Sequence, residues 1–233
     1  MGAYLVECAA FLLRWLHVVA AIAWIGESFY FVALDRGLEK PRQATPGLFG
    51  ESWSVHGGGF YLKRKFAVAP AELPAELHWS MWKSYTTWMS GFALLCFLYF
   101  SAPGAWLIDP AVAALDGGTA ILAALGLLLA TWIGYDVLCR LIGFRDRALG
   151  VAVALLVAAI AYAATHLFAG RAAFLLTGAA LATVMSANVF FVIIPGQRRM
   201  VAELRQGLTP DPLPGRRGKQ RSVHNTYFTL PVV

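Results

Sequence analysis

The residues with the clearest chemical potential lie inside a stretch that is otherwise apolar. Between Glu7 and Asp35 the sequence carries Arg14, His17, Trp24 and Glu27. A helix over this range is about 43 Å long at 1.5 Å per residue, more than a hydrocarbon core of about 30 Å. A central Arg in such a helix costs about 2.5–3.5 kcal/mol, so ionisable groups persist there mainly where they face a bundle interior, pair or hold a ligand. We therefore expect this helix to carry part of a functional site.

Composition indicates an integral membrane protein. Of the 233 residues, 59% are hydrophobic and only 14% are charged, and the mean hydropathy is +0.62. Soluble domains average about 25% charged residues. The three cysteines (Cys8, Cys96, Cys139) are isolated, and no CxxC or CxxCH motif occurs, so the sequence encodes neither a structural zinc site nor a covalent haem c site.

Five segments are long and apolar enough to predict an all-α bundle of transmembrane helices: 7–35, 78–102, 118–141, 148–169 and 172–195. A 36–77 loop follows the first span, and a basic loop, 196–221, follows the fifth. We expect one integral membrane domain over 1–233. Residues 222–233 read as the start of a sixth span, so we favour a piece of a longer protein over a re-entrant segment.

Basic residues alternate between the loops, which predicts the orientation. The 36–77 loop, the third loop and the 196–221 loop are rich in Lys and Arg, whereas the second has none and the fourth only Arg171. The positive-inside rule then places the three basic loops in the cytoplasm and the N-terminus outside. Because the positive charge lies beside the spans, its expected partner is the lipid bilayer and not a nucleic acid.

Two histidines are predicted in the outer half of the bundle. On a helix, Arg14, His17 and Trp24 share one face. His166 in the fourth span follows Tyr162 by one turn. Two imidazoles on facing helices near arginines are what a bis-histidine haem b requires, so His17 and His166 are candidate haem ligands. The alternative is that Arg14 snorkels, that His17 only hydrogen-bonds a neighbouring helix, and that His166 lies at the membrane interface.

A larger group of polar residues is predicted in the inner half. Together they could form a pocket that binds a small anion through Lys and amide donors, while His or Glu moves protons. A simpler possibility for Asp136 is an ion pair with Arg140, one turn away. The group comprises Glu27, His78, Lys83, Thr86, Thr87, Asp136, His224, Asn225 and Thr226.

The first loop contains an unusual glycine triplet. Three consecutive glycines, Gly57, Gly58 and Gly59, follow His56 within an aromatic sequence. Such glycines permit backbone conformations that other residues avoid, so we expect a small β-hairpin under the membrane. No amphipathic helix follows the triplet, which argues against a nucleotide-binding loop.

Several of these motifs, in this order along the chain, resemble the membrane urate hydroxylase family. The most specific are His-Gly-Gly-Gly-Phe-Tyr at 56–61 and Ala-Pro-Ala-Glu-Leu-Pro at 69–74. The others are Arg-Trp-Leu-His at 14–17, Ala-Trp-Ile-Gly at 23–26, Leu-His-Trp at 77–79, Tyr-Thr-Thr-Trp-Met-Ser-Gly at 85–91 and Val-His-Asn-Thr-Tyr-Phe at 223–228.

The resemblance implies a bacterial inner-membrane oxidoreductase of purine catabolism with about eight helices. It implies oxidation of urate to 5-hydroxyisourate, with electrons passed outward to a cytochrome c that is often fused at the C-terminus. This sequence stops at the sixth helix and lacks the haem c motif, which leaves open whether it is active alone. On this view His56, His78, Glu27 and His224 are catalytic candidates. Lys83, Thr86, Thr87, Asn225, Thr226 and Gly57 to Gly59 would bind urate, with Arg14, Trp24 and Asp136 in support.

Two rival functions remain open from the sequence. A membrane protoporphyrinogen oxidase shares a Leu-His…Trp motif in its first helix, but those chains are shorter and lack the glycine hairpin. A non-enzymatic copper-resistance or transport module would want clustered Met or His ligands. The five methionines here are scattered.

Overall fold

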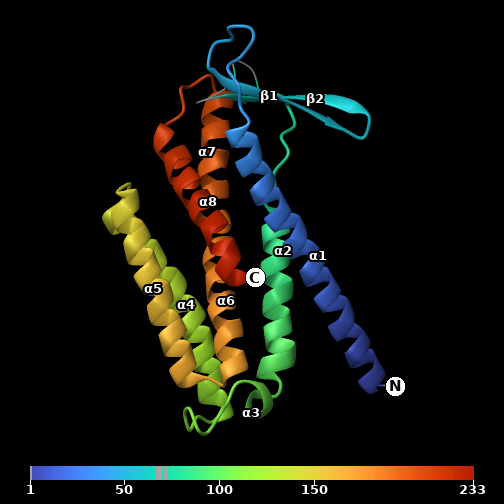
Figure 1. The fold of residues 1–233 in the computed structure, drawn as a ribbon, viewed down its shortest axis with the longest axis vertical. Helices are drawn as coiled ribbons and strands as arrows, with labels where there is room; N and C mark the ends of the chain where they lie inside the picture. The colour runs from blue at the N-terminus through green and yellow to red at the C-terminus, as the bar shows by residue number, and fades with distance from the viewer. Residues whose placement is uncertain (1, 67–69, 71–72) are drawn as a thin grey trace.

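A computed structural model describes residues 2–66, 70 and 73–233 of the chain, and it shows an elongated bundle of helices with a β-hairpin at one end (Figure 1). The expected all-α bundle is confirmed. The elements in order are α1 (Gly2–Arg36), β1 (Leu48–His56), β2 (Gly59–Phe66), α2 (Trp82–Leu94), η1 (Leu95–Phe100), α3 (Pro103–Trp106), α4 (Gly117–Ile142), α5 (Asp146–Leu167), α6 (Gly170–Ala187), η2 (Asn188–Ile193), α7 (Ile194–Arg205) and α8 (Pro212–Val232).

Four helices in the described part of the chain are long and apolar enough to cross a membrane: Tyr4–Arg36, Gly117–Ile142, Asp146–Leu167 and Gly170–Arg205. The N-terminus, α3 and the α5–α6 connection lie at one end of the bundle, and the hairpin and the α7–α8 connection lie at the other (Figure 1). The basic loops therefore share one end, as the alternation of charge predicted.

The second predicted span is not among these four helices. It corresponds to α2 continuing without a break into η1, a π-helical segment, and its first half carries Lys83, Thr86, Thr87 and Ser90. This polar half packs against α1, which is held to the molecule chiefly by α2. Side-chain hydrogen bonds between α1 and α2 thus replace part of the apolar surface that a lone span would need.

The region after the fifth span differs from the expected loop. The helix that starts at Gly170 continues through η2 and α7 to Arg205, and α8 begins at Pro212, so most of 196–221 is helical. Arg199 pairs with Glu203 one turn on (2.8 Å), and Asp211 caps α8 by accepting from the Leu213 amide (2.9 Å). Residues 222–232 are the second half of α8, which begins upstream at Pro212.

The hairpin predicted from the glycines is confirmed. β1 and β2 pair in antiparallel register, with Trp53 opposite Leu62 and His56 opposite Gly59. Gly57 and Gly58 form the turn with φ of 58° and 79°, a backbone region that strongly favours glycine. The hairpin lies beside the end of α1, where Lys65 pairs with Asp35 (2.6 Å).

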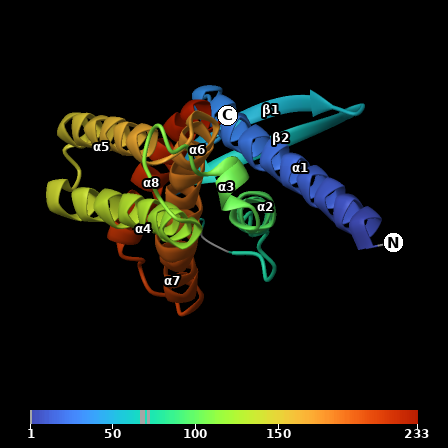
Figure 2. The same cartoon turned by 90° about the horizontal axis from the view of Figure 1, so that it is seen from below.

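The helices α4, α5 and α6 form the compact part of the bundle, and α8 lies against α6 and η2 (Figures 1 and 2). Their contact surfaces carry alanines that are fully buried, among them Ala120, Ala124, Ala164 and Ala172. Small residues allow close approach of helix backbones where lipid offers no hydrophobic driving force. This rigid unit provides one wall of the site, and α1 with α2 provides the other.

Candidate functional site

The inner half of the α1–α2 interface holds an ion pair. Lys83 Nζ lies 2.6 Å from Glu27 Oε1, and the Ser80 hydroxyl donates to the same oxygen at 2.8 Å. Both charged side chains are partly exposed. A carboxylate next to an ammonium group, on helices that form one interface, provides a proton acceptor and a cation for an anionic ligand.

His17 lies deeper in the same interface. Its Nδ1 is 3.0 Å from the Thr87 carbonyl oxygen and 3.2 Å from the Ser90 hydroxyl. A carbonyl oxygen only accepts, so Nδ1 is the donor when the ring bonds Thr87, and Nε2 of the neutral ring is then an acceptor. The imidazole is therefore oriented to accept or return a proton at Nε2.

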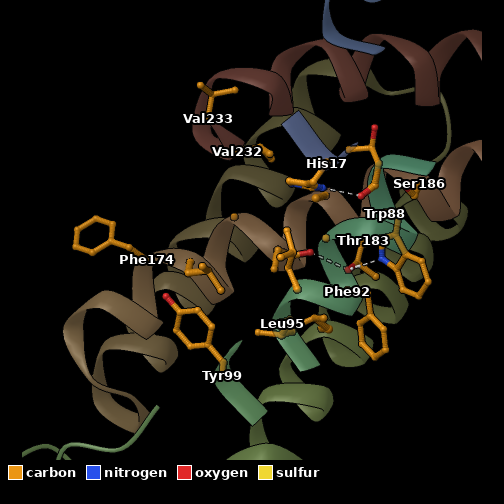
Figure 3. A pocket seen from close by; sticks show the side chains of 18 of the residues that line it. His17, Trp88, Phe92, Leu95, Tyr99, Phe174, Thr183, Ser186, Val232 and Val233 are labelled. Atoms are coloured by element: carbon orange, nitrogen blue, oxygen red, sulfur yellow. Dashed lines mark hydrogen bonds between the residues drawn. The ribbon is translucent and has the colours of Figure 1, made fainter. Parts of the chain in front are cut away.

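A pocket of about 600 Å³ adjoins His17 between α1, α2, η1, α6 and the end of α8. Polar groups gather at one end, where Figure 3 shows His17, Ser186 and Thr183, and the Trp88 indole donates to the Thr183 hydroxyl at 3.1 Å. Apolar side chains line the rest, including Leu95, Leu98, Tyr99, Leu128 and Phe174. This volume is typical of sites for small organic ligands.

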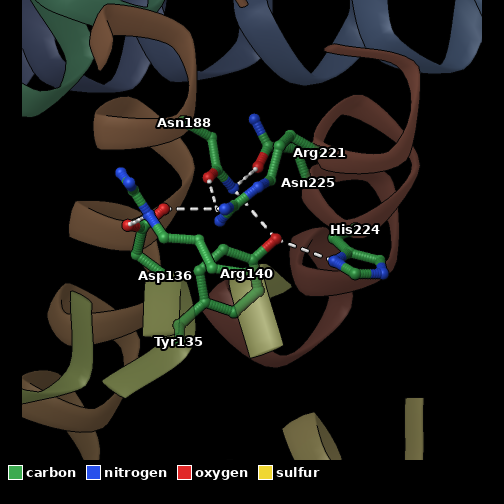
Figure 4. Close-up of polar contacts among 7 residues, drawn as sticks. All are labelled: Tyr135, Asp136, Arg140, Asn188, Arg221, His224 and Asn225. Carbon is green, nitrogen blue, oxygen red and sulfur yellow. Dashed lines mark hydrogen bonds and ion pairs between the residues drawn. The ribbon is translucent and has the colours of Figure 1, made fainter. Parts of the chain in front are cut away.

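A second polar cluster lies between α4, η2 and α8 (Figure 4). Arg221 donates to Asp136 (2.7 Å) and to Asn188 Oδ1 (3.2 Å), and its guanidinium lies 4.9 Å from the Tyr135 ring centroid. The Tyr135 hydroxyl lies 2.7 Å from His224 Nδ1. Asp136 also pairs with Arg140 at 2.6 Å, as one reading of the sequence predicted.

Asn188 and Asn225 complete this cluster. Asn188 Nδ2 donates to the Tyr135 hydroxyl (3.2 Å) and to Asn225 Oδ1 (2.9 Å), and Asn225 Nδ2 donates to the Met185 carbonyl (3.0 Å). Each member thus has a partner, and Asn188, Arg221 and Asn225 are buried. Such a satisfied network fixes the position of α8 against α4 and α6.

The structure divides the predicted inner site into two groups. Glu27, Lys83 and Thr87 belong to the α1–α2 group near the pocket, and Trp24 lines the pocket itself. Asp136, His224 and Asn225 belong to the cluster on α4 and α8. On α6, Ser186 faces the pocket while Asn188, two residues on, faces the cluster, so the helix separates the two groups.

Other predicted residues lie away from both groups. His56, Gly57 and Gly58 are exposed at the turn of the hairpin, which extends sideways from the bundle, and Gly59 follows them (Figure 1). His78 is exposed in the segment before α2. Arg14 is exposed near the outer end of α1, where it lines a smaller hollow of about 330 Å³ with Glu7 and Trp106. Thr86 and Thr226 are partly exposed beside their respective groups.

The arrangement of His17 and His166 does not fit the expected haem. His17 is on α1 and His166 is on α5, and these helices lie on opposite sides of the molecule in both views (Figures 1 and 2). His166 is exposed and bonds the Tyr162 carbonyl of its own helix at 2.9 Å. A bis-histidine haem needs both imidazoles on one axis, so this pair does not provide its ligands. Within the described residues, no group of three or more His, Cys, Asp or Glu is placed to hold a metal ion.

Sequence reasoning missed several residues of both groups. Asn188 and Ser186 are single polar residues in an apolar span, a signal that points to a buried partner. Arg221 lies at the end of the predicted 196–221 loop, and Tyr135 is not among the candidates named from the sequence. Both π-helical segments also went unpredicted, although η1 lines the pocket and η2 carries Asn188; such segments are frequent at functional sites.

Comparison with known proteins gives one match. The family model described as Urate oxidase N-terminal covers residues 3–233. The chain belongs to this family. Membership makes it an oxidoreductase at a coarse level, related to urate oxidation, and the apolar helices make it a membrane protein. Among curated proteins and solved structures no match is found.

Proposed function

We propose that the chain is the membrane part of an enzyme that oxidises urate to 5-hydroxyisourate in the bacterial inner membrane, with its N-terminus on the periplasmic side and a cytochrome c as the final electron acceptor. The observation that carries the proposal is the arrangement of Lys83, Glu27 and His17 along one interface in a member of the urate oxidase N-terminal family.

Lys83 and Glu27 suit an anionic purine. Urate is a monoanion at neutral pH, and it would reach the basic, cytoplasmic end of the bundle first. Lys83 meets its negative charge, and Glu27 accepts a proton as the ring is oxidised. When Glu27 takes this proton, its ion pair with Lys83 is lost and the substrate becomes more negative. Lys83 then interacts with the substrate, so protonation of Glu27 and binding of the substrate by Lys83 favour each other.

His17 handles the second proton in this scheme. Its Nε2 has the free lone pair, and the Thr87 carbonyl stabilises the imidazolium by accepting from Nδ1 at 3.0 Å. Overall, the urate monoanion and one water give the 5-hydroxyisourate monoanion, two protons and two electrons. Each cytochrome c takes one electron, so two are reduced for each urate.

The test is urate consumption in membranes that contain the full chain, followed by the ultraviolet absorbance of urate with cytochrome c added. Lys83→Met should raise KM for urate about tenfold or more, with a smaller effect on kcat, because it removes the cation that binds the substrate. Glu27→Gln should instead lower kcat. Lys83→Arg should restore most of the affinity.

Lys219→Met is the matched control, because Lys219 is exposed on α8 and its loss removes the same charge. It should leave both constants unchanged. A correctly inserted protein that consumes no urate with cytochrome c present would overturn the proposed function. Equal effects of Lys83→Met and Lys219→Met would overturn the assignment of Lys83.

A further inference from the structure

The pocket beside His17 is mostly apolar, which a urate site would not require. His17, Thr183 and Ser186 lie at one end of the pocket, and the Tyr99 hydroxyl lies near Phe174 at the other (Figure 3). Between them its length follows the apolar side chains of η1, α4 and α6. A ligand that matches these walls has a compact polar head and an apolar body. Urate, which is polar around its whole edge, does not.

One side of the pocket is exposed on the surface of the described helices. Phe174, one of its lining residues, is 84% exposed, and it lies on α6 inside a candidate membrane span. Leu175 lies on the same rim. A hydrophobic molecule dissolved in the bilayer could therefore enter from the side.

The electron count of the proposed reaction points to the same ligand. Urate gives up two electrons, whereas each cytochrome c accepts one, so a carrier that takes two electrons and releases them singly would match the two half-reactions. The histidine pair on α1 and α5 does not provide a haem for this purpose. A quinone can accept two electrons and release them singly.

We propose that this pocket binds an isoprenoid quinone, with the ring near His17 and the tail along Leu95, Leu98 and Phe174. This inference rests on the proposed urate oxidation for its electron donor. The quinone ring would lie within about a helical turn of Thr87, whose hydroxyl bonds the Lys83 carbonyl at 2.7 Å. The donor and acceptor sites would thus be neighbours along α2.

The step balances without a further reactant. The urate monoanion, water and quinone give the 5-hydroxyisourate monoanion and quinol, in which both quinone oxygens have gained a hydrogen. Protonated His17 delivers one proton from Nε2 to the nearer oxygen and regains it from the urate side. Two ferric cytochromes then reoxidise the quinol to quinone and release two protons.

The first test measures quinone binding and does not depend on urate turnover. The full chain in lipid nanodiscs, extracted with organic solvent, should release about one quinone per chain, measured by its redox difference spectrum. After delipidation, decylubiquinone should quench tryptophan fluorescence saturably, because Trp24 and Trp88 line the pocket.

Ala182→Phe places a ring inside the pocket and should abolish co-purified quinone and weaken decylubiquinone binding at least tenfold. Ala158→Phe is the matched control, since Ala158 is exposed on α5 away from the pocket, and it should bind normally. If Ala182→Phe does not fold, Leu175→Trp narrows the rim and should also weaken binding.

The outcomes separate the two proposals. Absence of bound quinone, phospholipid as the only co-purified ligand, or equal binding by Ala182→Phe and Ala158→Phe would overturn the quinone site. Full urate-to-cytochrome activity in quinone-free protein would also overturn it while leaving the urate reaction intact. Pocket-dependent quinone binding in a protein that consumes no urate would overturn the urate reaction alone.

Discussion

The hydrogen bond between His17 Nδ1 and the Thr87 carbonyl determines which ring nitrogen is available to exchange a proton. With the Nδ1 proton donated to the Thr87 carbonyl, Nε2 is the nitrogen that would exchange a proton in the proposed reaction. The sequence identified His17 as a polar residue in an apolar helix. It could not identify Gly91, whose role depends on how closely α1 and α2 approach.

Gly91→Ala should displace His17. A Cβ at this position would lie 2.7 Å from His17 Cε1, closer than such atoms are found, so the ring must move. We expect decylubiquinone binding to weaken at least tenfold, measured by tryptophan quenching, and urate turnover to fall with it.

Gly126→Ala is the control for this change, because a Cβ there meets nothing within 4 Å in the middle of α4. In a helix such a substitution is neutral or stabilising by about 0.4–1 kcal/mol. Unchanged binding and turnover in Gly91→Ala would show that the ring position is not important.

At the scale of elements, α8 shows where sequence reasoning stops. Its N-terminal half is rich in Pro, Gly and Arg, which indicates a loop, yet Arg221 and Asn225 make it a helix docked against α4 and η2. These contacts join residues more than 30 positions apart. Hydrophobic pattern and local propensity do not report such pairs.

Arg221→Leu should destabilise the docking of α8. Arg221 is 5% exposed and bonds Asp136 and Asn188, so its loss leaves Asp136 with only the exposed Arg140 and removes the donor to Asn188 Oδ1. Removing one member of a buried pair typically costs about 3–5 kcal/mol. Because Asp136 keeps Arg140, we expect the lower end of this range in the free energy of unfolding in mixed micelles.

The exposed neighbour Arg217 provides the comparison. Arg217→Leu removes the same charge from the surface of α8 and should change stability by less than about 0.5 kcal/mol. Equal destabilisation by both variants would mean that net charge, and not the Asp136 contact, holds the helix.

At the scale of the whole molecule, the orientation of the bundle in the membrane can be measured directly. In a cysteine-free background, Val112→Cys in the second loop should react with a membrane-impermeant maleimide from the periplasmic side. Val55→Cys in the hairpin should react only after the inner membrane is opened. Both positions are exposed, so access alone does not distinguish them. The reverse labelling pattern would mean that the bundle has the opposite orientation in the membrane.

The sequence predicted the helices, the hairpin and the charge pattern better than it predicted which site residues lie together. The helical bundle, the hairpin and the alternation of basic loops follow from hydropathy, glycine and charge, which are local properties. The grouping of site residues does not, because it depends on which helices are neighbours. His56 and His166 show this, since each is a candidate site residue in the sequence but lies away from the pocket.

The continuous helix from Gly170 to Arg205 has a mechanical consequence. Its 36 residues span about 54 Å, well beyond a hydrocarbon core of about 30 Å. The helix is therefore long enough to extend beyond the bilayer, with Asn188 between its two parts and Arg205 bonded to the Ala75 carbonyl near its far end. A displacement of the Arg205 end would therefore tilt the part of the same helix that lines the pocket.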